Sequence, residues 1–533
     1  MQLKKSTDSI ANYFLSEKIQ YNDRISGVLP NIPETIISFL ASAKIGAVWS
    51  SCSADFGPNA IIDRFKQIKP KILIVTDCYY YNGKKYNVIK KIQPVLKEIK
   101  SIKKIIVIPY DGKKISFFPK FKYINWNKIK NYESKNIIKK LFRFNHPLYI
   151  LYSSGTTGKP KCIVHGAGGS LIQHLKEHQL HCNIKKNDVV FYFTTCGWMM
   201  WNWLVSVLAS NARIILYDGS PFSPKKSILF DIIDKEKITF FGTGAKYIDA
   251  IKNENIKFIK THKLKSLKTL ASTGSPLSHE SFLYIYKNVK KNIHLTSISG
   301  GTDIVSCFVL GNPNEKVYPG EIQCKGLGME VDVFNKKGKS IKNKKGELVC
   351  KSPFPSKPLF FWNDKNNFLY KKSYFSQFHN VWYHGDFAKI TKNNGIIIYG
   401  RSDTTLNSGG VRIGTAEIYR IVENINQIFE CLVTEKEVKN DTKIIMFVKM
   451  NKNCSLNNKL KNQINNKIKK LLSTKHVPKK IIKVMDIPKT KSGKVMELVI
   501  KQIINGKKID NIESLTNPEC IAEYKNNKEL INL

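Results

Sequence analysis

Arginine and acidic residues are scarce in this chain of 533 residues. Only seven of its 87 basic residues are arginine, and its 41 aspartates and glutamates leave a formal net charge of +46. Proteins that read nucleic acids usually cluster their charge and use arginine for planar recognition. Here lysine is spread from end to end among asparagine and isoleucine. We interpret the charge as compositional drift, expect no specific nucleic-acid partner, and expect only weak, salt-sensitive binding to polyanions.

Long apolar runs are also missing. No stretch of about 18 or more apolar residues is present, so the sequence predicts no membrane span. The first residues contain two lysines with no apolar segment behind them, which is unlike a secretory signal. None of the 11 cysteines forms a C-x-x-C pair, a pattern that favours free thiols in a reducing compartment over zinc sites or disulfides. We therefore expect a cytoplasmic protein.

The few arginines are unevenly placed. Arg401, Arg412 and Arg420 lie close together in a chain that uses lysine almost everywhere else. A planar fork that binds phosphate or carboxylate with two hydrogen bonds is a physical reason why lysine would not serve there. This spacing points to an anion site near residues 401–420.

The apolar pattern predicts an α/β fold. A helix is expected over residues 34–50, after Pro33, and buried strands over 71–76 and 104–108. Such alternation is typical of a mostly parallel sheet. From about residue 320 the pattern changes to short strands, at 320–324, 330–334 and 346–351, which predicts a smaller β-rich unit. A strand over 395–399 and a polar turn then mark a boundary, so we expect domains at 1–402 and 403–533.

The segment 153–161 carries the strongest chemical signal. It follows a predicted strand over 148–152 and combines hydroxyls, glycines and lysines: Ser153, Ser154, Gly155, Thr156, Thr157, Gly158, Lys159, Pro160 and Lys161. Glycines let backbone N–H groups approach an anion, hydroxyls donate to phosphate oxygens, and lysine supplies charge. The spacing is not that of a Walker A loop, because only two residues separate Gly155 from Gly158.

Further blocks follow in a fixed order. They are Gly301-Thr302-Asp303, residues 383–386 (YHGD), 400–403 (GRSD), 409–414 (GGVRIG) with Glu417, and 488–494 (PKTKSGK). With the 153–161 loop, they resemble the signature of the adenylate-forming superfamily of acyl-CoA synthetases, luciferases and peptide-synthetase adenylation domains. Residues 196–203 (CGWMMWNW), 216–222 (LYDGSPF), 298–308 (ISGGTDIVSCF) and 409–420 (GGVRIGTAEIYR) narrow the resemblance to its acetoacetate–CoA ligases.

The resemblance implies an AMP-forming acid–thiol ligase. Its substrates would be ATP, acetoacetate and coenzyme A, with Mg²⁺ as cofactor, in lipid and ketone-body metabolism. The implied fold is a large N-terminal domain with parallel sheets flanked by helices and a β-rich subdomain, followed by a small mobile α+β domain with its hinge near Asp403. Two departures stand out. Family members carry a longer N-terminal stretch ahead of the point matching 21–33, and most of the superfamily has glutamate at Asp303.

The resemblance also implies roles for single residues. The 153–161 loop would hold the β- and γ-phosphates. Thr302, which follows Gly301, would contact an α-phosphate oxygen, and Asp303 would bind the Mg²⁺. Asp386 would accept both ribose hydroxyls, because an ionised carboxylate is an acceptor with room for two donors. Arg401 would contact the ribose and phosphate, and Gly274, Ser275 and Pro276 would line the adenine. Lys494 would contact the carboxylate and the α-phosphate. Gly409 and Arg412 would act in the thiol step.

The acid pocket is less specified. Trp198 and the run that follows it could line the pocket or belong to the core. Gly300 stands where acetate-specific relatives carry tryptophan, which would leave room for a longer acid, and Lys246 is a candidate contact for the keto group or carboxylate. Two alternatives stay open: a ligase for another short acid, such as propionate or butyrate, and a non-catalytic polyanion-binding remnant. The sequence leaves the oligomeric state open.

Overall fold

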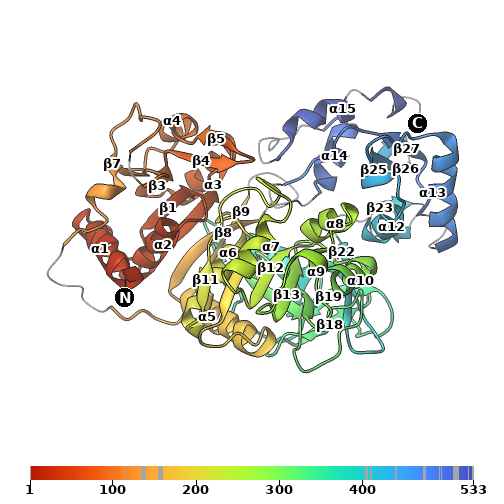
Figure 1. Ribbon diagram of the computed structural model, residues 1–533, viewed down its shortest axis with the longest axis horizontal. Coiled ribbons are helices and arrows are strands. Elements are labelled where there is room, and N and C mark those ends of the chain that lie inside the picture. Colours follow the sequence, from red (N-terminus) through yellow and green to blue (C-terminus); the bar gives the residue numbers. More distant parts are fainter. Residues whose placement is uncertain are drawn as a thin grey trace.

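The computed structural model describes most of the chain. The described residues are 2–112, 114–133, 140–153, 160–402, 406–408, 411–413, 415–438, 441–471, 476–490, 493, 495–507, 515–525 and 527–530. Figure 1 shows the N-terminal elements on one side, a second layered body in the middle and the C-terminal elements in blue at the opposite end. The expectation of an α/β fold is confirmed.

An eight-stranded sheet forms the N-terminal body. Its strand order is β20-β9-β8-β2-β1-β3-β6-β7, and it is parallel from β8 to β7. The strands are β1 (Arg24–Leu29), β2 (Val48–Ser53), β3 (Ile72–Thr76), β6 (Lys104–Ile108), β7 (Ile124–Asn125), β8 (Pro147–Ser153), β9 (Lys161–Gly166) and β20 (Phe360–Phe361). A hairpin of β4 (Cys78–Tyr81) and β5 (Lys84–Asn87) stands beside it.

Both faces of this sheet are covered, which explains why its strands read as continuous apolar runs. In β3, Ile72 and Ile74 face one core, whereas Leu73 and Val75 face the other. The helices of this body are α1 (Gln2–Ser16), α2 (Pro33–Ile45), α3 (Pro58–Ile68) and α4 (Ile89–Glu98). The predicted strands at 71–76 and 104–108 are confirmed.

Helix α2 is shorter than predicted. It ends at Ile45, where Gly46 adopts a left-handed conformation with φ of 76° and its N–H caps the helix. The expected helix over 34–50 was therefore wrong at its end, because residues 48–53 form β2 in the middle of the sheet. A glycine in this position is a common helix stop.

A second, five-stranded parallel sheet follows, in the order β11-β10-β12-β13-β14. Its strands are β10 (Val189–Tyr192), β11 (Arg213–Ile215), β12 (Phe240–Gly244), β13 (Thr269–Thr273) and β14 (His294–Ser297). The helices of this part are α5 (Ala167–Lys176), α6 (Met199–Ser206), α7 (Ile228–Lys235), α8 (Ala245–Asn253), α9 (Phe258–Thr261) and α10 (His279–Asn288), and a π-helical turn, η2 (Glu177–His181), continues α5.

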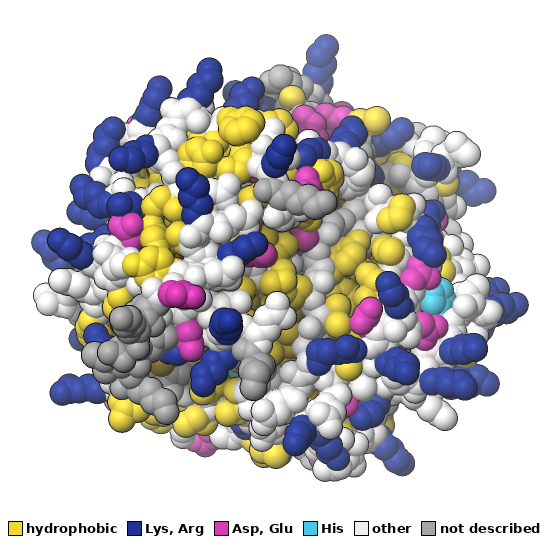
Figure 2. All heavy atoms as spheres, turned by 60° about the vertical axis from the view of Figure 1, so that its left-hand side comes forward, with side chains coloured by type: hydrophobic (Ala, Val, Ile, Leu, Met, Phe, Trp, Pro, Cys, Tyr) yellow, Lys and Arg dark blue, Asp and Glu magenta, His cyan; other side chains and the backbone are white. Residues whose placement is uncertain are grey.

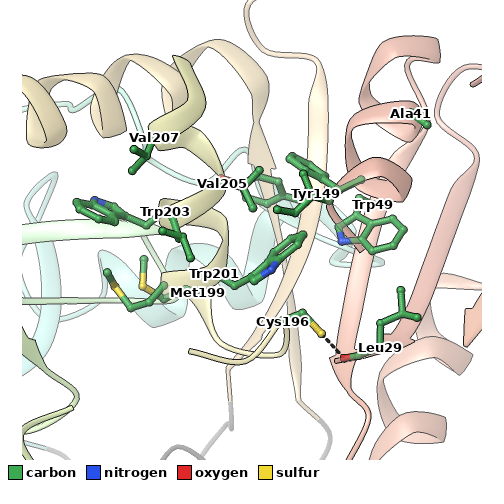
Figure 3. Close-up of a cluster of buried hydrophobic side chains, with 14 of the residues drawn as sticks. Leu29, Ala41, Trp49, Tyr149, Cys196, Met199, Trp201, Trp203, Val205 and Val207 are labelled. Atoms are coloured by element: carbon green, nitrogen blue, oxygen red, sulfur yellow. Dashed lines mark hydrogen bonds between the residues drawn. The ribbon is translucent and has the colours of Figure 1, made fainter. Parts of the chain in front are cut away.

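The two sheets share one core. Val190, Tyr192 and Phe240 of the second sheet belong to the same buried cluster as Trp49 and Tyr149 of the first. Helix α6 runs between the sheets and supplies the aromatic centre of this cluster (Figure 3). Five residues of α6 have relative exposures of 0–7% and lie in the core: Met199, Met200, Trp201, Trp203 and Leu204. This burial agrees with the core alternative for these residues, whereas Trp198 is only partly buried.

The β-rich unit expected after residue 320 is present. It contains an antiparallel sheet in the order β18-β19-β21-β22 and a smaller one of β15, β16 and β17. The bounds are β15 (Ser299–Gly301), β16 (Ser306–Leu310), β17 (Cys324–Lys325), β18 (Val331–Phe334), β19 (Gly346–Cys350), β21 (Trp382–Ile390), β22 (Ile396–Arg401) and the helix α11 (Phe368–Tyr374). The strand expected at 320–324 was misplaced, since only Cys324 belongs to one.

The C-terminal elements form a sheet of their own, in the order β25-β26-β27. They are β23 (Leu406–Ser408), β24 (Val411–Ile413), α12 (Thr415–Val422), β25 (Ile428–Val438), β26 (Asp441–Met450), α13 (Asn458–Leu471), β27 (Lys480–Lys483), α14 (Glu497–Ile504) and α15 (Ile521–Lys525). Two buried clusters consist solely of residues from Leu406 onward, one on each face of this sheet. The boundary at 402/403 remains a prediction that agrees with these separate cores.

The surface carries the excess of lysine. Figure 2 shows lysine and arginine side chains distributed over the whole visible face, with apolar and acidic groups between them, rather than gathered into one stripe. This distribution fits a solvated surface better than a nucleic-acid track. Among the described residues, none of the helices is both long and apolar enough to cross a membrane.

A close backbone approach between β15 and β16 requires a glycine. A Cβ atom added to Gly300 would lie 1.9 Å from the carbonyl oxygen of Ser306 and 2.6 Å from the Cα of Cys307. We expect Gly300→Ala to destabilise the fold at the upper end of about 1–3 kcal/mol, because backbone atoms cannot move aside as a side chain can. Chemical denaturation of the parent and the variant measures this loss.

Gly244→Ala is the matched control, because the nearest atom to a Cβ there is the Thr273 oxygen at 3.8 Å, an ordinary contact. We expect it to cost about 0.5–1 kcal/mol at most, from the helix cap that Gly244 provides. Equal stability losses for the two variants would contradict the close approach at Gly300.

Candidate active site

A carboxylate in the turn after β15 lies at the centre of the candidate site. Asp303 is half-buried, and its Oδ1 accepts a 2.6 Å hydrogen bond from the hydroxyl of Tyr374 in α11. Burial by itself would raise the pKa of Asp303. The nearby His384, the Tyr374 hydrogen bond and the cations Arg401 and Lys161 outweigh that effect and lower the pKa. Asp303 is therefore an ionised carboxylate facing two cations.

Lys161 lies near the ring of Tyr374, whose hydroxyl binds Asp303. It stands at the start of β9, and its Nζ donates a 3.0 Å hydrogen bond to Ser373 Oγ. The same ammonium lies 5.8 Å from the ring centre of Tyr374 and 5.6 Å from that of Phe361. The predicted phosphate lysine and the predicted metal carboxylate thus meet across one tyrosine. Tyr374 was not anticipated, because nothing in its sequence surroundings marks it.

Asp386 and Arg401 are neighbours in the sheet. They are directly paired residues of the antiparallel strands β21 and β22. Arg401 Nη1 lies 3.9 Å from Asp386 Oδ1 and donates a 3.0 Å hydrogen bond to the carbonyl of His384. Gly385 has φ of 79°, and a Cβ there would lie 2.9 Å from Arg401 Nη2. The glycine of the YHGD block therefore makes room for the guanidinium.

His384 joins this pair to the Asp303 turn. Its Nε2 lies 3.4 Å from Asp386 Oδ2, and a Cβ on Gly301 would be 3.2 Å from its ring. The imidazole also packs edge-on against Phe308 of β16, with 4.7 Å between ring centres. Burial lowers the pKa of His384, against the opposing effect of Asp386. The 301–303 and 383–386 blocks, far apart in the sequence, are in contact through this side chain.

The predicted adenine segment lies beside the predicted acid pocket. Gly274 follows β13 with φ of 88°, and a Cβ there would approach the indole of Trp198 to 3.9 Å. Trp198 caps α6, is only partly buried, and packs edge-on against Tyr192, with 6.1 Å between ring centres. Ser275 and Pro276 come directly after Gly274. The two predicted subsites therefore share a boundary.

A buried carboxylate supports both halves of the site. Glu177, with 0% exposure, accepts hydrogen bonds at Oε1 from the Ser306 hydroxyl and, over 3.1 Å, from the Cys307 N–H, both in β16. Its Oε2 accepts a 2.9 Å bond from the Trp203 indole in α6. Gln173 donates to Oε1 over 3.2 Å. Sequence reasoning missed Glu177; the nearby histidines in the 174–181 segment were the available signal.

Two pocket candidates behave differently from expectation. The Cβ direction of Gly300 points at β16, so the structure gives this glycine a backbone reason in addition to the predicted room for a longer acid. Lys246 ion-pairs with Glu423 and Glu430, over 3.3 and 3.4 Å. Both carboxylates belong to the C-terminal elements, so its ammonium is engaged by them rather than free for the acid in this arrangement.

Several predicted residues lie outside the described part of the chain. These are Ser154, Gly155, Thr156, Thr157, Gly158, Lys159, Asp403, Gly409 and Lys494. Arg412 belongs to β24, whose backbone pairs with β23. Ser153 ends β8 and pairs with Lys161 across the antiparallel β8–β9 ladder, so the described ends of the predicted phosphate loop are adjacent. Thr302 follows β15 directly, between Gly301 and Asp303.

Comparisons with known proteins agree with this geometry. A sequence model of the family described as AMP-binding enzyme matches residues 1–358. The acetoacetyl-coenzyme A synthetase of Rhizobium meliloti (strain 1021) is 48% identical over 531 residues, which cover 99% of this chain and 81% of the relative. The acetoacetyl-CoA synthetase of Gallus gallus is 45% identical over 522 residues, 96% of this chain and 78% of that protein.

Solved structures show the same relationship. The acetoacetyl-CoA synthetase from Streptomyces lividans superposes with a TM-score of 0.91 at 36% identity, covering 98% of this chain and 80% of that one. The anthranilate CoA ligase AuaEII, solved with anthranoyl-AMP, has a TM-score of 0.80 at 18% identity, over 94% of this chain and 91% of its own, a likeness of fold alone. The chain belongs to the AMP-binding enzymes and, within them, to the acetoacetyl-CoA synthetase family.

Proposed function

We propose that the chain joins acetoacetate to coenzyme A at the cost of ATP, giving acetoacetyl-CoA, AMP and diphosphate. The observation that carries this proposal is the 42–48% identity to acetoacetyl-CoA synthetases along almost the whole chain. The reaction has two steps in one site. A mixed anhydride of acetoacetate and AMP forms first, and the thiol then displaces AMP from it.

In the first step a carboxylate oxygen of acetoacetate bonds to the α-phosphorus of ATP. The bond from that phosphorus to the bridging oxygen of diphosphate breaks, and the oxygen leaves with the electron pair. Negative charge gathers on the leaving group, so catalysis needs cations and N–H donors rather than a protein nucleophile. Lys161 is a described cation beside the Asp303 turn. The 154–159 segment and Lys494 are proposed to supply the remaining donors, and Thr302 a hydroxyl to the α-phosphate.

Asp303 has the chemistry to hold Mg²⁺. No cluster of three or more histidine, cysteine, aspartate or glutamate side chains suited to a metal exists within the described ranges. Mg²⁺ is usually bound by one or two carboxylates together with substrate phosphates, and it does not need an all-protein cage. An ionised aspartate beside a phosphate-binding lysine meets this requirement. When bound there, the ion would neutralise charge on the phosphate oxygens.

Asp386 and Arg401 are proposed to hold the ribose end of the nucleotide. The Asp386 carboxylate is 7% exposed and already faces Arg401 and His384, which fix its orientation. Gly274, Ser275 and Pro276 would lie along the adenine, next to the indole of Trp198. In this proposal the adenylate would lie between the β13 turn and the strand pair β21–β22.

In the second step the sulfur of coenzyme A bonds to the acyl carbon. The bond from that carbon to the AMP oxygen breaks, AMP leaves with the electron pair, and the thiol proton goes to solvent. We propose that residues 403–533 rotate about Asp403 between the steps, withdrawing Lys494 and presenting Gly409 and Arg412. Such a hinge lets two reactions share one site.

The two alternatives lead to different measurements. A ligase for another short acid, such as propionate or butyrate, would show the same nucleotide chemistry with a different acid preference. A non-catalytic polyanion-binding remnant would show no acid-dependent exchange of diphosphate into ATP. Among the predicted nucleotide-site residues, Lys161 and Arg401 lower the pKa of Asp303, and Arg401 lies 3.9 Å from Asp386. Such a grouping of charged side chains favours an active ligase.

Acid preference is the first test of the proposal. In a diphosphate-exchange assay over a panel of short acids, we expect acetoacetate to exceed acetate in kcat/KM by about 10–200-fold, the range for pocket-size discrimination. A keto oxygen with a buried partner would add to this difference. A preference for acetate, propionate or butyrate would replace the acetoacetate assignment, and no exchange with any acid would remove the ligase assignment.

Asp386→Ala should weaken ATP binding. Loss of a charged acceptor for two ribose hydroxyls is expected to cost about 1–3 kcal/mol, the range for hydrogen bonds to charged groups. Isothermal calorimetry with ATP measures it. Asp386→Asn keeps the size of the side chain and one acceptor oxygen, so its loss should be smaller. Unchanged affinity in both variants would take Asp386 out of the nucleotide site.

Tyr374→Phe should change the pH dependence of adenylation. The Tyr374 hydrogen bond favours the ionised form of Asp303 and helps to lower its pKa. Without this bond the pKa rises toward its ordinary value, so Asp303 takes up a proton at a higher pH. We expect the acid limb of the kcat/KM profile for ATP and Mg²⁺ to move to higher pH. The rate should therefore fall more at acidic pH than at neutral pH.

Tyr370→Phe is the control for this experiment. Tyr370 lies in the same helix and, like Tyr374, packs against Phe361, but its hydroxyl donates to the Pro358 carbonyl instead. The acid limb of the kcat/KM profile of the Tyr370→Phe variant should coincide with that of the parent. If the two variants shift alike, packing in α11 rather than the bond to Asp303 controls the profile.

A further inference from the structure

Lys246 occupies a place that the reaction above does not use. It is the second residue of α8, which directly follows β12, at the carboxyl end of the parallel five-stranded sheet. The next strand of that sheet, β13, leads at the same edge into the Gly274 turn. In open α/β sheets this edge is where ligands bind. Lys246 is therefore a cation at the rim of the active site.

Its partners come from the other part of the chain. The Nζ lies 3.3 Å from Glu423 Oε1, just after α12, and 3.4 Å from Glu430 Oε1 in β25. Figure 1 shows α8 and α12 side by side where the green and blue parts of the chain meet. The Glu430 side chain is only 4% exposed. A carboxylate buried to this extent is costly without cationic partners.

The same glutamate also binds the C-terminal lysine segment. Glu430 Oε2 forms an ion pair with the ammonium of Lys489, the second residue of the PKTKSGK block. The described residues of this block lie close together. Lys489 forms a bridge with Val495, which follows the block, and the Gly493 N–H donates a 2.8 Å bond to the Thr490 carbonyl. Glu430 thus holds one lysine from each side of the interface.

This segment lies against Lys246 itself. A Cβ atom added to Gly493 would be 3.9 Å from the Cβ of Lys246. The segment that carries the proposed catalytic lysine is therefore packed on the first turn of α8. The carboxylates raise the pKa of Lys246, against the opposing effect of burial, so the side chain stays charged.

We propose that Lys246 is a positioning residue that holds the C-terminal elements in the adenylate-forming orientation. It binds Glu423 and Glu430, and through Glu430 it keeps Lys489 and the neighbouring Gly493 at the rim of the active site. An ion pair that exists in only one orientation shifts the population toward that orientation. Rotation for the thiol step must break it. The inference rests on the proposed function, in which Lys494 acts only in the first step.

The test is Lys246→Met, which keeps the length of the side chain and removes its charge. The two half-reactions are measured separately, as diphosphate exchange with acetoacetate and as thiol transfer from chemically prepared acetoacetyl adenylate. We expect about a tenfold loss in exchange, a modest value because Lys246 is one-third exposed, and an unchanged or faster thiol step. The KM values for acetoacetate and ATP should stay close to the parent's.

Lys252→Met is the matched control, since Lys252 lies in the same helix and faces Asp249 of that helix, 3.9 Å away. It should leave both half-reactions unchanged. The double variant of Lys246→Met with Glu423→Gln should be no slower in exchange than Lys246→Met alone, because both changes break one contact. Additive losses would contradict a shared ion pair.

Two results would overturn the inference. Equal losses in both half-reactions would make Lys246 a residue of general stability. A loss confined to the KM for acetoacetate would make it an acid-binding residue, the role first expected from the sequence. Failure of the proposed function itself is distinguishable, because the parent protein would then show no diphosphate exchange.

Discussion

The Glu177 carboxylate is the interaction on which the candidate site depends most. It is fully buried, and a polar group removed from water is tolerated only where hydrogen bonds compensate it. The compensation here comes from the Trp203 indole in α6, the Ser306 hydroxyl and the Cys307 N–H in β16. Because the donors belong to two elements, a single side chain fixes α6 against β16.

The consequences reach both ends of the site. Strand β16 pairs with β15 in a register that sets Gly300 opposite Cys307 and Gly301 opposite Ser306, and Asp303 follows in the next turn. Helix α6 begins just after Trp198, whose indole borders Gly274. The proposed wall of the acid pocket and the carboxylate proposed for Mg²⁺ are thus held in position by one anchor, which suits a reaction that tolerates little displacement of its reacting groups.

Charge is used differently at the interface with the C-terminal elements. A chain with a net charge of +46 offers few carboxylates to its lysines, so a glutamate buried between two of them is informative. Glu430 joins Lys246 of α8 to Lys489 of the C-terminal lysine segment. Unlike the Glu177 network, this contact lies between two separate cores and can be broken without opening either.

The sequence by itself determined the family and the class of fold, and it supplied candidates for the nucleotide-handling residues. Runs such as 71–76 predict buried strands because both faces of a parallel sheet are apolar, and ordered motif blocks identify an adenylate-forming enzyme. Helix ends were less certain: α2 stops at Gly46 because β2 must begin at Val48. The domain boundary and the roles of the site residues stay predictions that agree with the structure.

Other features were decided only by the tertiary structure, because they depend on contacts between residues far apart in the chain. Tyr374 meets Asp303 across 71 positions, and Glu177 meets Cys307 across 130. Gly300 is required by the carbonyl of Ser306, which no local pattern reveals. Lys246, one lysine among many in the sequence, is distinguished only by the two glutamates that folding brings to it. Periodicity and motifs report local geometry, whereas the partner of a buried charge is chosen by the packing of whole elements.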